Sequence, residues 1–122
     1  MTLPRPWAAS EMSVSELRFP AEPVHVRTAR LVAGAVARQS GLDDSDVEDI
    51  RLAVGEACSL ALEGAETLRL VFNSEDTALW ISVGTDGILD PDSDDLALVV
   101  LQSLASELEV SERGLRMSWP VA

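Results

Sequence analysis

Few side chains in this sequence are of the types that carry out chemistry, and the most reactive ones stand alone. The single cysteine, Cys58, lies in an apolar helical pattern and has no second cysteine with which to form a disulfide or a metal site. We interpret it as a buried core residue in a protein of the reducing cytoplasm, since buried free thiols are usually inert. The single histidine, His25, has no identifiable acid–base partner, so we assign it no catalytic role.

Carboxylates are the remaining candidates. Glu56, in the segment RLAVGEAC, is either a general base or a polar remnant. The run Asp90–Asp95 places four aspartates around a proline and a serine, but it lacks the loop pattern and distal glutamate of an EF-hand. We interpret this run as a solvated turn before a helix, because negative charge near a helix N-terminus is stabilising. We therefore predict no metal site.

The charge of the chain excludes several classes of function. Nine basic and twenty-one acidic residues give a net charge of −12, which argues against direct binding to nucleic acid or to an anionic membrane. Hydrophobic residues form 47% of the 122 residues, the balance of a globular protein, and no apolar run is long enough to span a bilayer. We predict a loose tail over residues 1–12 and one domain over residues 13–122.

The first half of the chain predicts one strand and two helices. Leu17 and Phe19 alternate with Arg18 in a strand that Pro20 ends. Apolar residues at helical spacing predict a helix over residues 23–40. A second helix is predicted to start at Ser45, which stands three residues before Glu48 in a capping-box pattern, and to run to Gly64. Its predicted core stripe is Val47, Ile50, Val54, Ala57, Cys58 and Ala61.

The second half predicts four strands and one helix. TLRLVF and ALWISV alternate and form an antiparallel hairpin across residues 73–76. A helix follows in LALVVLQSLASEL, then short strands at LEV and LRMSWPV. The order βααββαββ predicts a two-layer α/β sandwich, with a mixed, mostly antiparallel sheet covered on one face by helices. The predicted core stripe of the third helix is Leu96, Val99, Val100, Leu104 and Leu108.

A family resemblance rests on two segments. ELRFPAEPVHVRTARLVAGAVARQSGLDDSDVEDIRLAVGEACSLAL, within which RLAVGEAC is the most specific part, and the closing LRMSWPV resemble the actinobacterial branch of anti-sigma regulatory factors. These are the serine-protein-kinase members of the GHKL superfamily, which has the histidine-kinase-like ATPase (Bergerat) fold. The resemblance covers residues from about 14 to the C-terminus. It implies binding of ATP and magnesium, inhibition of a sigma factor, and phosphorylation of an anti-anti-sigma antagonist.

The first family motif is Glu-x-x-x-Asn, in which the asparagine binds magnesium and the glutamate is the proposed base. Glu56 aligns with the glutamate, whereas Leu60 replaces the asparagine. Magnesium requires oxygen ligands, so a leucine cannot hold it. The second motif, Asp-x-Gly-x-Gly, reads adenine. Aligned on Gly87, it has Thr85 in place of the aspartate, and Asp86 is one residue out of register.

Branched side chains replace the second glycine of that motif, at Ile88 or Leu89, and are predicted to fill part of the nucleotide pocket. The third motif, Gly-x-Gly, presents bare backbone amides to the phosphates at a helix N-terminus. Aligning the end of this helix on Glu109 and Val110 puts Asp95, Leu96 and Ala97 at those positions. The carboxylates of Asp94 and Asp95 would repel a triphosphate, and ILDPDS is too short for the family's mobile lid.

Arg27, Arg30 and Arg38 form a basic stripe on one face of the first helix. Either this stripe is a solvated face with weak local ion pairs, or it docks a protein partner. We predict an anti-sigma-like regulator that binds a sigma factor or an anti-anti-sigma antagonist, without nucleotide or metal cofactor. A homodimer is also compatible with the sequence. The alternative is an active serine-protein kinase with unusual nucleotide contacts.

Overall fold

The computed structural model describes residues 13–121, so the predicted tail of residues 1–12 lies outside the described residues. The described residues form five strands and three helices in the predicted order. Their bounds are β1 Ser13–Pro20, α2 Pro23–Gln39, α3 Asp44–Leu62, β2 Thr67–Ser74, β3 Ala78–Thr85, α4 Leu96–Leu104, β4 Glu107–Ser111 and β5 Gly114–Pro120. None of these helices is long and apolar enough to cross a membrane.

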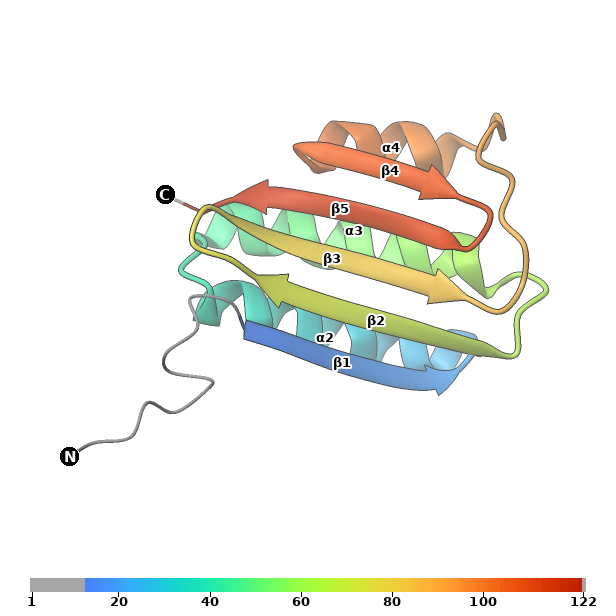
Figure 1. The fold of residues 1–122 in the computed structure, drawn as a ribbon, viewed down its shortest axis with the longest axis horizontal. Helices are drawn as coiled ribbons and strands as arrows, with labels where there is room; N and C mark the ends of the chain where they lie inside the picture. The colour runs from blue at the N-terminus through green and yellow to red at the C-terminus, as the bar shows by residue number, and fades with distance from the viewer. Residues whose placement is uncertain (1–12, 122) are drawn as a thin grey trace.

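One sheet and one helical layer make up the fold. The strand order is β1-β2-β3-β5-β4, and all four pairings are antiparallel, so the described sheet is antiparallel throughout rather than mixed. The helices lie together behind the sheet, and among residues 13–121 no helix covers its other face, which we call the uncovered face (Figure 1). The predicted two-layer sandwich is thereby confirmed.

The core lies between the sheet and α3. Alternation places one set of side chains from β2, β3 and β5 toward the helices, as predicted. These buried residues are Leu68, Leu70, Phe72, Leu79, Ile81, Val83, Leu115, Met117 and Trp119. Every member of the predicted α3 stripe is also buried, and α3 contacts both neighbouring helices as well as the sheet.

The start of α3 differs from the prediction. Asp43 is the N-cap residue, and its carboxylate accepts a hydrogen bond from the Asp46 amide at 2.9 Å. Ser45 is therefore already inside the helix. Glu48, its expected partner, instead pairs with Arg51 at 3.2 Å. An aspartate is as good an N-cap as a serine, so the earlier residue caps the helix.

The buried face of α4 was predicted only in part, since Leu104 and Leu108 of the predicted stripe pack against the core. Leu98 and Leu101 are buried, whereas Leu96 and Val99 are exposed by 72% and 58%. The helix is apolar almost all round, so its sequence does not single out one face. Helix α4 also ends earlier than predicted, at Leu104. Leu108, the last residue of the predicted stripe, and the alignment anchors Glu109 and Val110 therefore lie in β4.

Candidate functional site

The residues of the degenerate motifs surround the end of α3, the loop from β3 to α4, and the start of α4. A hollow of about 290 Å³ lies there, which we call the α3–α4 hollow. This volume is at the lower limit of typical ligand pockets. Its lining combines apolar side chains with three carboxylates, and consists of Leu60, Glu63, Ile88, Leu89, Asp90, Ser93, Asp95, Leu98 and Val110.

Thr85, at the position of the adenine-reading aspartate, is held by its own chain. Its hydroxyl donates to the Ala61 carbonyl at 2.9 Å and accepts from the Gly87 amide at 3.0 Å. One acceptor lone pair remains, but the hydroxyl proton is committed to the end of α3. Thr85 therefore ties β3 and its following turn to α3.

Asp86, the displaced aspartate, is also used within the chain. Its carboxylate accepts hydrogen bonds from the amides of Glu66 and Thr67, at 2.8 and 3.1 Å. These backbone donors, Thr67 first, lower the pKa of the Asp86 carboxyl below its ordinary value. Asp86 fixes the start of β2 and does not line the α3–α4 hollow.

This pairing predicts a pH dependence. Because the folded pKa of Asp86 is lowered, its contribution is complete above its ordinary pKa of 3.8 and is lost as pH falls through the folded pKa. Asp86→Asn should therefore lower the free energy of unfolding at pH 7, and the difference from wild type should shrink below about pH 4. Urea unfolding at several pH values measures it. Asp76→Asn, at an exposed turn position, is the control, and a pH-independent difference for Asp86→Asn would contradict the assignment.

Asp95 occupies the N-terminus of α4. It is the N-cap residue, and its carboxylate accepts from the Ala97 amide at 2.9 Å. An amide that the third motif would offer to a phosphate is thus already paired with a carboxylate of the same chain. The alignment anchor at Glu109 and Val110 was wrong, since both lie in β4, yet Asp95 does stand at the helix start.

Leu60 and Leu89 turn inward, whereas Ile88 does not. Leu60 is half-buried against the core and Leu89 is buried, while Ile88 is 78% exposed. The Leu89 amide donates to the Glu112 carbonyl at 3.0 Å, which holds this part of the loop against the turn between β4 and β5. Glu56 is half-buried on α3 but does not line the α3–α4 hollow. The structure therefore brings Leu60, Leu89 and Asp95 together with the exposed Ile88 around the hollow, whereas Glu56 and Asp86 do not line it.

Other chemistry-bearing residues have structural settings. Cys58 is buried, and desolvation raises the pKa of its thiol to about 12, so it remains protonated. His25 lies 3.7 Å from the Glu22 carboxylate and beside the Phe19 ring. No group of three or more His, Cys, Asp or Glu side chains in residues 13–121 is arranged to hold a metal ion.

The arginine stripe lies on α2, and its members have different neighbours. Arg38 pairs with Asp44 at 3.6 Å, and both side chains are well exposed. The aliphatic part of Arg30 lies over Gly55 of α3, where a Cβ would meet its Cδ at 3.1 Å. Arg27 is exposed. The stripe is thus accessible, but Arg30 also contributes to packing between α2 and α3.

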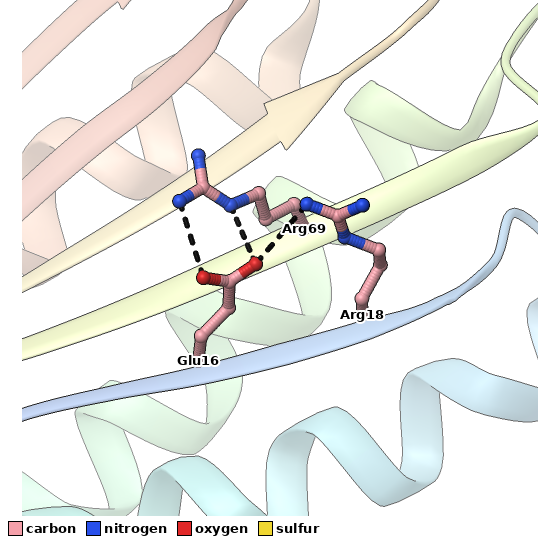
Figure 2. Close-up of polar contacts among 3 residues, drawn as sticks. All are labelled: Glu16, Arg18 and Arg69. Atoms are coloured by element: carbon pink, nitrogen blue, oxygen red, sulfur yellow. Dashed lines mark hydrogen bonds and ion pairs between the residues drawn. The ribbon is translucent and has the colours of Figure 1, made fainter.

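Sequence reasoning missed a cluster on the uncovered face of the sheet. Arg69 of β2 and Arg18 of β1 both contact the carboxylate of Glu16 (Figure 2). Nearby, the Arg116 guanidinium lies 3.8 Å from the centre of the Trp80 ring. The alternation of β1 and β2 places these side chains on the outer face, but only strand pairing brings them together.

The fold agrees with the comparison to known families. The histidine kinase-like ATPase domain matches residues 19–119, and the chain belongs to this family. It is similar to the serine-protein kinase RsbW of Bacillus velezensis, with 42% identity over 50 residues, covering 41% of this chain and 31% of that protein. RsbW of Bacillus cereus strain AH187 is 30% identical over 78 residues, covering 60% and 49%. The predicted family is confirmed.

A solved structure gives the same fold. The crystal structure of the RsbU and RsbW domains of Rv1364c from Mycobacterium tuberculosis matches with a TM-score of 0.65 and 20% identity. The match covers 87% of this chain and 32% of that chain. The matched segments span between 31% and 49% of the RsbW proteins named above. Resemblance to the actinobacterial branch in particular stays a prediction.

Proposed function

We propose that this chain is a cytoplasmic anti-sigma-factor-like regulator that acts by binding a sigma factor or an anti-anti-sigma antagonist, without binding ATP. The similarity to RsbW kinases supports the regulatory class. One observation supports the absence of ATP binding: the polar groups at the motif positions are paired within the chain. Asp95 caps α4, Asp86 holds the start of β2, and Thr85 holds the end of α3.

Loss of ATP binding follows from the chemistry of these positions. Leu60 offers no oxygen to magnesium. The Asp95 carboxylate stands at the helix N-terminus, where a phosphate would otherwise be stabilised, and like charges repel there. The α3–α4 hollow also carries Glu63 and Asp90, which add to that repulsion. With no basic side chain in the described lining, a triphosphate would face carboxylates that no positive charge compensates.

An active serine-protein kinase is the second candidate. The retained Glu56 and the names of the RsbW relatives favour it. A kinase must hold both the phosphates and the metal, so its nucleotide contacts would have to come from residues outside the family pattern. Nucleotide binding separates the two candidates, because partner binding is common to both.

ATP with magnesium is expected to leave the melting temperature unchanged. A site with a dissociation constant of about 10 μM would add about 2.7 kcal/mol of stability at about 1 mM ATP, which would raise the melting temperature by several degrees. Thermal unfolding and calorimetry with ATP and magnesium, together and separately, measure this. ATP with magnesium should also leave the melting temperature of the Leu60→Asn variant unchanged, because the Asp95 carboxylate still repels the phosphates. A shift that requires both ATP and magnesium would support the kinase instead.

A further inference from the structure

Four of the nine arginines lie on or beside the uncovered face of the sheet. All nine basic residues are arginines, and Arg18, Arg69, Arg113 and Arg116 lie on or beside this face. Arg18 and Arg69 are direct partners across the β1–β2 pairing. Like charges opposite each other on neighbouring strands are unfavourable, so this arrangement is not one that stability alone would select.

One carboxylate bridges that pair. Glu16 accepts from Arg69 Nε at 2.7 Å and Nη2 at 3.2 Å, and from Arg18 Nη2 at 3.3 Å. Figure 2 shows both guanidinium groups directed at the same carboxylate. The forked contact with Arg69 is the geometry in which arginine binds carboxylates best. The two arginines therefore already form a carboxylate site, and an acid of the same chain occupies it.

The surface beside this pair is hollow. A depression of about 490 Å³ is lined by Arg18, Arg69 and Arg113. It adjoins a second of about 300 Å³ at Gly84 and Arg113, whose lining also includes the Arg116–Glu109 pair. We call the two together the arginine groove. Gly84 pairs with Gly114, so two neighbouring strands present no side chains at its floor. The groove follows from this pair of glycines and from the arginines around it.

The positive charge in the groove is incompletely balanced. Arg113 forms no ion pair with any acid in residues 13–121. Asp86 lines the larger depression, but its carboxylate is directed to the amides that open β2. Glu16 is the acid that serves both Arg18 and Arg69. Glu109, which lines the smaller depression, pairs with Arg116 at 3.6 Å. Arg18, Arg69 and Arg113 therefore have Glu16 as their remaining acid in the described ion pairs.

We propose that the arginine groove binds an acidic peptide segment of another protein, with carboxylates of that segment contacting Arg18, Arg69 and Arg113. The net charge of −12 does not prevent this, because charges beyond about 8 Å are largely screened at physiological salt. A long nucleic acid is disfavoured, since its phosphates would extend over the surrounding acidic surface. The proposal stands apart from the proposed function, because it requires neither loss of ATP binding nor a sigma factor.

The proposal predicts that removing the charge of Glu16 strengthens peptide binding. Glu16 is an internal competitor for Arg18 and Arg69, so removing its charge should free their donors for an incoming carboxylate. Glu16→Gln is therefore expected to tighten binding of an acidic peptide several-fold. Glu63→Gln removes the same charge from the helical side of the molecule and is the matched control. A general change in net charge would affect the two variants equally.

The test uses a hexaglutamate peptide, with hexaglutamine as the uncharged probe. Binding is followed by NMR titration of the full chain, in which the arginine Nε–H signals report the contacts directly. Arg18→Gln with Arg113→Gln keeps the Arg69–Glu16 pair and should weaken hexaglutamate binding about tenfold. Gln102→Glu with Thr77→Glu makes the same change in net charge at exposed positions outside the groove and should leave binding unchanged.

Four results would overturn the proposal. One is equal weakening in the two double variants, which would show that only net charge matters. Another is the absence of shifts at the arginine Nε–H signals when hexaglutamate is added. The third is that an oligothymidylate of equal charge binds as tightly as hexaglutamate. The fourth is that the face is closed by a second copy of the chain. Sedimentation at several concentrations distinguishes that last case.

Discussion

Gly114→Ala should lower the free energy of unfolding by about 3 kcal/mol or more and the melting temperature by about 10 °C. Gly114 has a φ of +152°, where side chains are strained. A Cβ at this position would also collide with the Val83 carbonyl oxygen and lie 3.0 Å from the Gly84 Cα. Both contacts are with the backbone of β3, which cannot move away without breaking its pairing. Thermal and urea unfolding measure the loss.

Gly84→Ala is the matched control, because it adds the same methyl group to the neighbouring strand. Its Cβ would meet no atom closer than the Arg69 carbonyl oxygen, at 3.6 Å, which is ordinary contact. The free energy of unfolding should change by less than about 0.5 kcal/mol. If both variants lose similar free energy of unfolding, the close approach of Gly114 to the Val83 backbone is not the reason that glycine is required there.

The largest functional effect is expected from the arginine stripe on α2. If it docks an acidic partner surface, Arg27→Gln with Arg38→Gln should reduce partner capture at least tenfold, mainly through slower and salt-dependent association. Folding should be nearly unaffected, since the Arg38–Asp44 pair is exposed and such pairs contribute little. Arg30 is left intact because it packs over Gly55. The measurement is pull-down from the source cytoplasm, with the captured protein identified and its association rate determined.

A control must change the net charge equally while sparing both the arginine stripe and the arginine groove. Gln102→Glu with Thr77→Glu does so, because both positions are exposed, one on α4 and the other in the β2–β3 turn. Capture by this variant should match wild type. Unchanged capture by the arginine variant would assign the stripe to a solvated face. Equal losses in both variants would mean that overall charge governs association.

Local patterns in the sequence were sufficient for most of the fold. Strand alternation and helical spacing each specify which face is apolar, so β1, β2, β3, β5 and α3 were predicted with the correct faces inward. Asp95 was also expected at a helix start, although the alignment that placed it there was anchored on residues that lie in β4. The buried face of α4 could not be predicted in the same way. Its surface is apolar almost all round, so packing against neighbouring elements determines which side is buried.

Contacts between distant segments were decided only by the tertiary structure. Asp86 meets the amides of Glu66 and Thr67 because the end of β3 lies beside the start of β2, and no local pattern indicates that meeting. Glu16 and Arg69 are separated by 53 positions and come together through the register of β1 against β2. Residue type and spacing determine the chemistry that a side chain offers. Strand pairing and helix packing determine which partner takes it up, since those partners are distant in sequence.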